Sequence, residues 1–377
     1  MANIKTINVK IENSSWIPPH TVPPKLYSLA KTGRMDIDLD CCLLFFGILT
    51  KPPITRGFTL ADCWAWLRYP PAFITGADLR FCSGWADIDS HQKTVASDEL
   101  GVAFTTWALL STLDFQYYAD TNWVINKLKT VTTIKRSKRG PSKTPDYIAY
   151  DLSGEMSVLE CKGGQTNQKA IWGAIEGGKE QKSNVKSAGG KTFVHTLVAG
   201  MFIPQSDSSE SALLAIADPD YDLFKSEIEK YSPEQILNSA RQVAIAKELS
   251  LFGFTETAVT LVTPEKDQIN ISKKFYHDIE NIHDNIKNNN VVIKDKELKW
   301  SIPVCINNVN YNGVRFTGEI SVDELIYLTN KNAETHLDSQ IAEKLSNNRW
   351  VKKYISEDIT ELKSPFGARY KIEWLRQ

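Results

Sequence analysis

Two carboxylates and one ammonium near the middle of the chain are the residues best suited to do chemistry. Asp146 follows a proline, and Glu160 and Lys162 stand two positions apart further along the sequence. Carboxylate oxygens are the ligands that Mg²⁺ prefers, and a bound divalent ion lowers the pKa of a water that it holds. A lysine beside such a pair could position that water. The set predicts metal-assisted hydrolysis, provided that the fold brings the three side chains together.

The stretch 145–164 has the pattern of one β-hairpin. Two apolar, β-branched and aromatic runs flank Leu152-Ser153-Gly154, and a three-residue hairpin loop favours glycine last, where the chain turns left-handed. Pairing centred on Ser153 places Asp146 opposite Glu160, although a bulge at Gly154 could shift the register by one residue. Opposed like charges destabilise a sheet unless a cation compensates them. Strand alternation puts Lys162 on the face of Glu160. The other expected pairs are Tyr150 with Met156 and Ile148 with Val158.

The motif Pro145-Asp146 … Glu160-Cys161-Lys162 resembles the PD-(D/E)XK nuclease superfamily, also called the restriction-endonuclease-like fold. The resemblance covers roughly residues 97–205. It implies that Asp146 and Glu160 hold one or two Mg²⁺ (or Mn²⁺) ions, with help from the backbone carbonyl of Cys161. It also implies that Lys162 orients or deprotonates the attacking water. The alternative is an ordinary hairpin in which Glu160 and Lys162 form a solvated ion pair.

Two helices are expected beside this hairpin. The first should run from Ser97 to about Leu113, with acids in its first turn, and Glu99 begins its inward-facing stripe. The resemblance implies that Glu99 adds one more acid to the metal site; the alternative is a surface glutamate that stabilises the helix dipole. Thr166 or Asn167 can cap the second helix, which Gly177-Gly178 should weaken or end. Gln165 and Gln168 lie near its start, and the resemblance implies only a weak role for them in orienting the substrate.

A strongly basic segment precedes Asp146. Between Thr121 and Pro145 there are seven basic residues and no acidic one. We expect a first strand at Thr130–Ile134, followed by a loop that could hold a nucleic-acid backbone. The alternative is a solvated loop without a ligand. The residues expected to contact phosphate are Lys135, Arg136, Lys138, Arg139 and Lys143.

The composition excludes several classes of protein. In 377 residues, 44 basic and 45 acidic side chains nearly cancel, so any nucleic-acid contact must be a local patch. The six cysteines form no Cys-x-x-Cys pair, which favours a reducing cytoplasm and no structural zinc. The most apolar run, Cys41–Leu49, is far shorter than the roughly 20 residues of a membrane-spanning helix. We therefore expect a soluble cytoplasmic protein, without a signal peptide and without a membrane partner.

The pattern of elements predicts an α/β (α+β) protein with a restriction-endonuclease-like core, in which helices flank a mixed central sheet. We expect an N-terminal accessory region at 1–90, the nuclease-like core at 91–258, and a C-terminal α+β domain at 259–377 for recognition or a protein partner. Further expected elements are a buried strand within Asp36–Thr50, a strand at Thr192–Ile203, a helix from a Ser232 capping box to about Leu251, an Asn312-Gly313 hairpin turn, and a half-buried closing strand with Tyr370, Ile372 and Trp374.

The sequence thus favours a Mg²⁺-dependent nuclease that hydrolyses phosphodiester bonds of nucleic acid, with DNA as the first choice of substrate. Bacterial restriction or anti-phage defence is the first choice of role, and DNA repair is the second. A rival from another class is a non-catalytic nucleic-acid-binding or assembly subunit that keeps the fold. In a third interpretation the hairpin motif is coincidental and the protein is an unrelated binding module.

Overall fold

The computed structural model describes residues 3–16, 21–55, 57–128, 145–182, 193–218, 232–264, 271–282, 286–287, 291–306, 309–325 and 349–377. The chain divides into two compact units. The hairpin unit consists of Asn3–Cys42 and Arg68–Arg241, and the C-terminal unit of Met1–Ala2, Leu43–Leu67 and Gln242–Gln377. The boundaries of these units differ from those of the predicted domains 1–90, 91–258 and 259–377. That these three segments are separate domains therefore stays a prediction.

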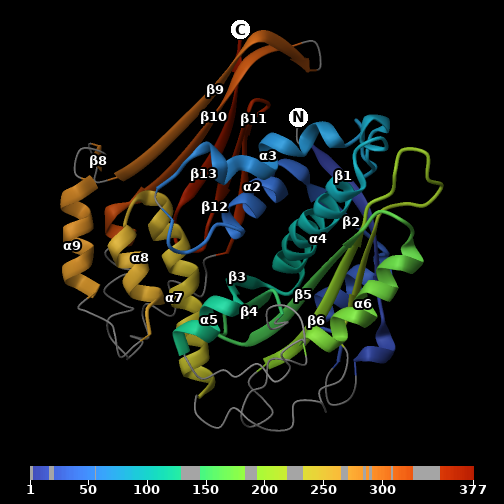
Figure 1. Cartoon of the computed structure of the whole chain (residues 1–377), viewed down its shortest axis with the longest axis horizontal. Helices are drawn as coiled ribbons and strands as arrows, with labels where there is room; N and C mark the ends of the chain where they lie inside the picture. The colour runs from blue at the N-terminus through green and yellow to red at the C-terminus, as the bar shows by residue number, and fades with distance from the viewer. Residues whose placement is uncertain are drawn as a thin grey trace. The chain divides into compact units, whose positions relative to one another are not determined.

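The hairpin unit is built on a mixed sheet. The seven strands described in this sheet lie in the order β2-β1-β7-β6-β5-β4-β3 (Figure 1). The strands are β1 (Ile4–Ile11), β2 (Arg34–Asp38), β3 (Phe115–Asp120), β4 (Tyr147–Asp151), β5 (Met156–Gly164), β6 (Phe193–Phe202) and β7 (Leu213–Ala217). The pairs β1–β7 and β5–β6 are parallel and the others antiparallel. With helices flanking this sheet, the predicted mixed α/β class is confirmed.

Helices α4 and α6 pack on β5 and β6 from opposite faces (Figure 1). Gly163 of β5 faces the backbone of α4, whereas Gly200 of β6, the register partner of Lys162, faces Ile171 of α6. The described helices that lie wholly in this unit are α1 (Pro24–Thr32), α4 (Ser90–Thr112), α5 (Thr121–Leu128) and α6 (Gln168–Lys182). Three helices contain residues of both units: α2 (Leu39–Leu49), α3 (Trp64–Arg68) and α7 (Pro233–Phe252). Alternation along β5 therefore directs Glu160 and Lys162 to the α6 face.

Helix α4 begins earlier than predicted. It starts at Ser90 rather than Ser97, because the Asp89 carboxylate caps it by accepting a hydrogen bond from the His91 N–H at 2.8 Å. Asp98 and Glu99 therefore lie well inside the helix, and their assignment to its first turn was wrong. The segment Thr130–Ile134 lies outside the described residues, and the strand that follows α4 is β3.

The predicted strand within Asp36–Thr50 is also mostly wrong. Strand β2 ends at Asp38, and helix α2 follows directly. The Asp38 carboxylate accepts a hydrogen bond from the Cys41 N–H at 2.9 Å, which satisfies a donor at the start of the helix. Because nearly every side chain of α2 is buried, its sequence has no amphipathic pattern that would separate it from a buried strand.

Other element predictions are confirmed. Asn167 caps α6 through a 2.7 Å hydrogen bond from the Ala170 N–H, although α6 continues past Gly177-Gly178 instead of ending there. The Thr192–Ile203 prediction corresponds to β6. Ser232 and Gln235 form the expected reciprocal cap of α7, which ends at Phe252.

The C-terminal unit contains an antiparallel sheet. Its described strands are ordered β11-β12-β13-β10-β9-β8. They are β8 (Ile286–Lys287), β9 (Val291–Ile306), β10 (Val309–Ser321), β11 (Val351–Ser356), β12 (Ile359–Lys363) and β13 (Arg369–Arg376). The expected Asn312-Gly313 turn is wrong, because both residues lie within β10, where the register shifts between Tyr311 and Gly313. The closing strand is confirmed as β13, with Tyr370 and Ile372 buried.

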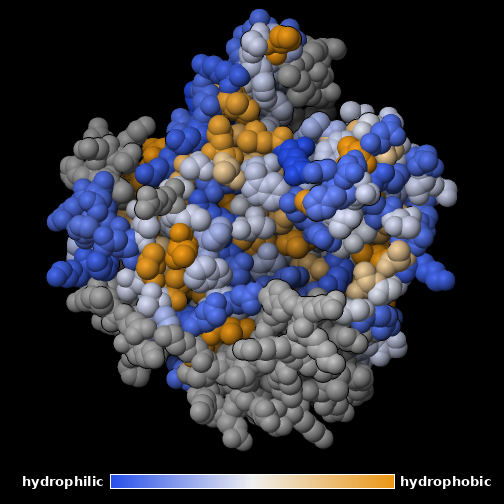
Figure 2. Space-filling view, viewed as in Figure 1, coloured by the Kyte–Doolittle hydropathy of each residue, from blue (hydrophilic) through white to orange (hydrophobic). Residues whose placement is uncertain are grey.

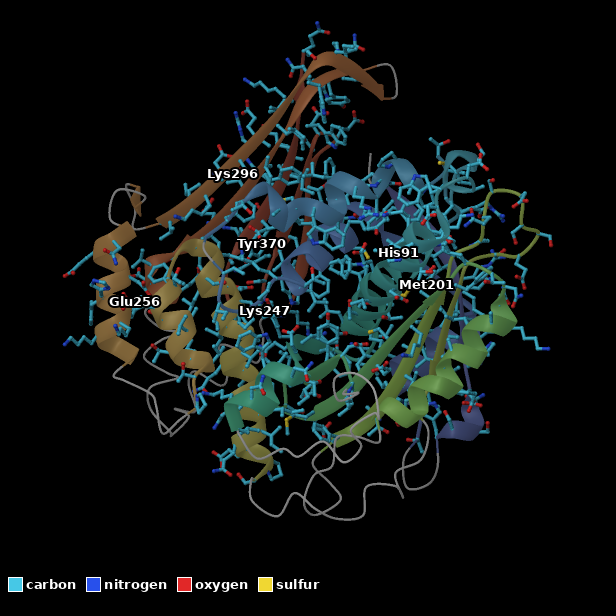
Figure 3. All side chains as sticks on the ribbon, in the orientation of Figure 1. His91, Met201, Lys247, Glu256, Lys296 and Tyr370 are labelled. Atoms are coloured by element: carbon cyan, nitrogen blue, oxygen red, sulfur yellow. The ribbon has the colours of Figure 1, made fainter. Side chains whose placement is uncertain are left out.

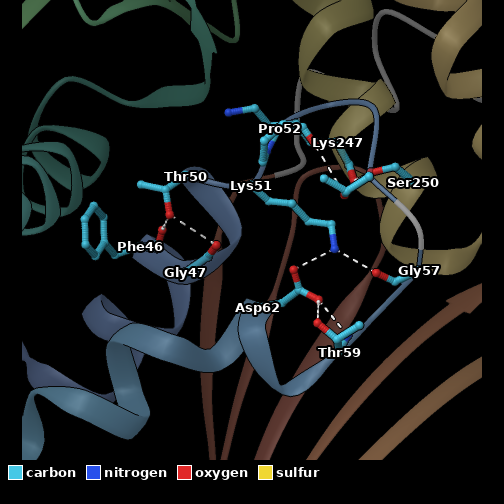
Figure 4. Close-up of polar contacts among 11 residues, drawn as sticks. Phe46, Gly47, Thr50, Lys51, Pro52, Gly57, Thr59, Asp62, Lys247 and Ser250 are labelled. Carbon is cyan, nitrogen blue, oxygen red and sulfur yellow. Dashed lines mark hydrogen bonds and ion pairs between the residues drawn. The ribbon is translucent and has the colours of Figure 1, made fainter.

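Buried charges hold part of this unit together. The Lys51 ammonium binds the Asp62 carboxylate at 2.6 Å and the Gly57 carbonyl at 2.7 Å, and Asp62 also accepts the Thr59 N–H (Figure 4). Lys247 of α7 is fully buried and donates to the Leu49 carbonyl. Since each of these charges has its partners, we interpret the network as structural.

Helices α8 (Thr255–Val262) and α9 (Ile271–Ile282) complete the described part of this unit. Glu256 of α8, labelled in Figure 3, pairs with Lys274 at 2.7 Å and His277 at 3.0 Å on α9. The outer face of α9 is hydrophilic (Figure 2). None of the described helices combines the length and the apolar character that crossing a membrane requires.

Candidate active site

The hairpin of β4 and β5 has the predicted register. Tyr150 pairs with Met156 and Ile148 with Val158, and no shift interrupts the pairing. Gly154 in the turn has φ of +83°, a left-handed conformation that glycine adopts without strain. This register places the two acids of the motif at the open end of the hairpin.

Asp146 lies directly before β4 and is fixed at both its side chain and its backbone. Its Oδ2 accepts a hydrogen bond from the Cys161 N–H at 2.8 Å, and its carbonyl accepts one from the Thr121 N–H at 3.1 Å. In an extended strand the N–H and C=O of one residue point to the same side. The Cys161 carbonyl therefore faces the side of β5 on which Asp146 lies, as the resemblance implies.

Glu160 is almost fully buried, at 3% exposure. Its Oε1 accepts a hydrogen bond from the Lys162 ammonium, whose side chain is 22% exposed. Its Oε2 is buried and has no hydrogen-bond partner among the described residues. A buried acceptor left without a donor costs about 1–3 kcal/mol. The site therefore favours a species that supplies positive charge to this oxygen, either a proton or a cation.

Burial and mutual repulsion raise the pKa of both acids. The pKa of Glu160 rises to about 7, first because the group is buried and second because of the Asp146 charge, while Lys162 and a hydrogen bond from the Asp146 backbone N–H oppose the rise. Burial also raises the pKa of Asp146; the Cys161 N–H and Lys162 oppose this, and Asp120 and Asp98 add to it. Several carboxyl groups thus act on one another beside the Lys162 ammonium, and their mutual repulsion would be relieved by an added cation.

Asp98 and Asp120 are two acids that the sequence interpretation missed. Asp98 of α4 and Asp120 at the end of β3 both act electrostatically on Asp146, and burial raises the pKa of Asp98 while Lys162 lowers it. Glu99, the predicted helix acid, instead accepts a hydrogen bond from the Tyr69 hydroxyl. Burial, and then the hydrogen bond to Glu99, hold the pKa of Tyr69 well above its usual value.

Two glycines bring α4 close to the motif strand. A Cβ on Gly163 would lie 1.7 Å from the Ser97 carbonyl oxygen, and a Cβ on Gly101 would lie 2.6 Å from the Gly163 nitrogen. Only glycine at both positions allows this backbone contact. Asp98 stands three positions before Gly101 and shares its helix face.

The donor atoms at this site fit a hard divalent cation. They are the Glu160 Oε2, the Asp146 carboxylate and the Cys161 carbonyl. Mg²⁺ keeps several waters and commonly uses one or two carboxylates together with substrate phosphate, so a pair of acids suffices. Among the described residues, no three His, Cys, Asp or Glu side chains form a group arranged to hold a metal ion. A resident metal would therefore rest on two carboxylates rather than on a closed cage.

The two glutamines expected near the substrate have internal partners. Gln165 donates to the Lys93 carbonyl at 3.0 Å and accepts from the Gln205 side chain at 2.6 Å. The Gln168 side chain donates to the Ser211 carbonyl at 3.0 Å. Both amides thus join the start of α6 to neighbouring segments. The predicted phosphate-binding residues Lys135, Arg136, Lys138, Arg139 and Lys143 lie outside the described residues.

Comparison with known proteins identifies no family for this chain. No protein-family model, no curated protein and no solved structure matches the chain.

Proposed function

We propose that the chain is a metal-dependent nuclease that hydrolyses phosphodiester bonds of nucleic acid, and that the hairpin unit contains a PD-(D/E)XK-like core. One observation carries the proposal: Glu160 is buried beside Asp146, with Lys162 on one carboxylate oxygen and no described partner on the other. A structural ion pair needs no second acid and leaves no orphaned oxygen. A proton would satisfy this oxygen, whereas a divalent cation would also offset the charge of Asp146.

Each residue has a distinct task in this proposal. Asp146 and Glu160 hold Mg²⁺ or Mn²⁺ with the Cys161 carbonyl, and the ion supplies Lewis-acid stabilisation of the phosphate and a more acidic water. The Cys161 N–H keeps Asp146 oriented. Lys162 lies within hydrogen-bond reach of Glu160 and positions or accepts a proton from the attacking water.

DNA is the proposed substrate, and the basic residues that precede Asp146 in the sequence are proposed to hold its phosphates. Restriction or anti-phage defence in the bacterial cytoplasm is the proposed setting, with the C-terminal unit available for recognition or a protein partner. One observation favours the non-catalytic alternative: Lys162 already compensates Glu160 in the metal-free protein, as it would in a retired site.

A cleavage assay separates these two functions. Purified protein is incubated with supercoiled plasmid and with single-stranded DNA, in Mg²⁺, Mn²⁺ or EDTA. The nuclease proposal predicts cleavage in either metal and none in EDTA. Binding of the same DNA without cleavage in any metal would favour the non-catalytic subunit.

A further inference from the structure

A second pocket lies at the turn end of the same hairpin. It has a volume of about 360 Å³ and is formed by the end of β4, the starts of β3, β5 and β6, the end of α4 and the start of α1. Small-molecule pockets in proteins measure about 300–1,000 Å³. Asp151 lines it, and at about 3.3 Å per strand residue it lies roughly 16 Å from Asp146. The pocket is therefore distinct from the candidate active site.

Ser157 is a buried polar side chain that lines this pocket. It is 2% exposed, and its hydroxyl makes no hydrogen bond to any described residue. Its register partner across the parallel strand pair is His195, which also lines the pocket. Register partners project to the same face. A ligand atom in the pocket would thus reach the hydroxyl and the imidazole together.

The neighbours of His195 favour one tautomer of its ring. Its Nδ1 lies 3.4 Å from the Asp218 Oδ2, and Trp16 contacts the ring edge-on at 5.4 Å between centroids. Asp218 is itself fixed, because its Oδ1 accepts the Thr196 N–H at 2.8 Å. His195 Nδ1 makes no hydrogen bond among the described residues, and the nearby Asp218 charge favours a proton on that nitrogen, which leaves Nε2 of the neutral ring as an acceptor.

The charges lining the pocket do not balance. Its described lysine, Lys25, is already paired with Asp114 at 2.5 Å. Asp151 uses Oδ1 to accept the Glu155 N–H at 2.9 Å, and its other oxygen has no partner among the described residues. The Glu155 carboxylate is exposed and likewise forms no ion pair within the described chain. Within the described residues neither carboxylate forms an ion pair, and the Arg241 guanidinium near this turn lies 3.6 Å from the position that a Cβ on Gly154 would take.

We propose that this pocket binds the ammonium group of a primary aliphatic amine. Asp151, Glu155, the Ser157 hydroxyl and the His195 Nε2 offer acceptors, and an ammonium supplies three donors together with a positive charge. Leu113, Phe115 and Val194 line the same pocket and suit a hydrocarbon chain. The amine is either a free small diamine or the side chain of a lysine, and both present this chemistry.

Calorimetric titration of the full chain tests the proposal. It is carried out in EDTA without nucleic acid, so that its outcome does not depend on the proposed nuclease activity. The ligands are putrescine, Nα-acetyl-lysine amide and tetramethylammonium, which has the charge but no N–H donor. One putrescine or one lysine amide should bind per chain, and tetramethylammonium should bind at least about tenfold more weakly. The tighter of the first two ligands identifies the source of the amine.

Variants separate a built site from surface attraction. Asp151→Asn with Glu155→Gln keeps the Oδ1 acceptor of the turn but removes both charges, and should weaken binding at least about tenfold. Ser157→Ala should weaken it about threefold to tenfold. Asp207→Asn, an exposed acid beyond the far end of β6, is the matched control and should leave affinity unchanged.

Three results would overturn the proposal. The first is no binding of either amine at millimolar concentration. The second is equal binding of tetramethylammonium, because the acceptors would then be irrelevant. The third is an equal loss of affinity in the Asp207→Asn control, which would mean that amines only screen the acidic surface.

Discussion

The backbone N–H of Cys161 donates a hydrogen bond to the Oδ2 of Asp146 at 2.8 Å. The contact ties the residue that precedes β4 to the residue between Glu160 and Lys162. The Pro-Asp and Glu-x-Lys halves of the motif are therefore held in one geometry before any ligand binds. Such preorganisation is what a metal site or a catalytic site requires.

Gly163→Ala should strongly destabilise the protein. The added Cβ would lie 1.7 Å from the Ser97 carbonyl oxygen, so α4 or β5 must move, and we expect a loss of about 3 kcal/mol or more, or failure to fold. Gly173→Ala is the matched control, because nothing lies within 4 Å of its Cβ position on α6. It should be neutral or stabilise by up to about 1 kcal/mol. Urea unfolding measures both, and equal stability of the two variants would contradict the close α4–β5 contact.

Glu160→Gln should stabilise the metal-free protein, and more so as the pH rises. Burial, and then the Asp146 charge, raise the pKa of Glu160 from 4.5 to about 7. The stability that comes from holding this proton is present below the unfolded pKa and is lost as the pH rises through the folded one. A tenfold change in proton affinity corresponds to about 1.4 kcal/mol, so the free energy of unfolding of the variant should exceed that of the wild type by up to about 3 kcal/mol near pH 8.

Unfolding in EDTA near pH 5 and near pH 8 checks this pH dependence. The wild type and the Glu160→Gln variant should differ little near pH 5 and clearly near pH 8. Asp207→Asn, which changes an exposed acid, should show no such trend. If Glu160→Gln is less stable than the wild type near pH 8, Glu160 is a favourable ion-pair partner of Lys162 rather than an acid under repulsion.

Lys162→Ala should slow cleavage by about 10²- to 10⁴-fold while Mg²⁺ binding persists, because the ammonium positions water and is not a metal ligand. Removing this cation raises the pKa of Glu160 further, so metal titration belongs near pH 8.5. Single-turnover rates and calorimetry measure the two effects separately. Lys31→Ala, an exposed lysine of α1, is the control. Loss of metal binding and of folding together would make Lys162 a structural partner only.

Neutralising Lys135, Arg136, Lys138 and Arg139 together should weaken DNA binding about equally for all sequences. Each phosphate contact contributes roughly 0.9 to the slope of log affinity against log salt for duplex DNA. The quadruple variant should therefore have a flatter slope, while its chemistry at saturating DNA is retained. Binding across a salt series, in Ca²⁺ to prevent cleavage, measures the slope. An unchanged slope would mean that these residues do not touch the substrate.

The hairpin could be predicted because its signals are local. Gly154 at the turn and the apolar runs on either side fix the pairing of Tyr150 with Met156, and neither depends on the rest of the chain. The capping of α6 by Asn167 and of α7 by Ser232 was predictable for the same reason. Confirmed elements are those whose start or turn is encoded within a few residues.

The remaining acids around the site depend on tertiary packing. Asp98 is placed by the contact of Gly101 with Gly163, which no local pattern encodes. Asp120 was missed because β3, buried on both faces, lacks the alternation that marks a half-buried strand, so the first strand was assigned to Thr130–Ile134 instead. The start of α4 was missed because Ser97, followed by two acids, resembles a helix start as closely as Asp89 does.

The most direct test of the account measures Mg²⁺-dependent DNA cleavage by the wild type, Asp146→Asn, Glu160→Gln and the exposed-acid control Asp207→Asn. The wild type and the control should cleave in Mg²⁺ and not in EDTA. The two site variants should lose at least about 10³-fold in single-turnover rate while their thermal melts in EDTA show folded protein. Full cleavage by either folded site variant, or no cleavage by the wild type in any divalent metal, would contradict the assignment of Asp146 and Glu160 as the metal-binding pair of a nuclease.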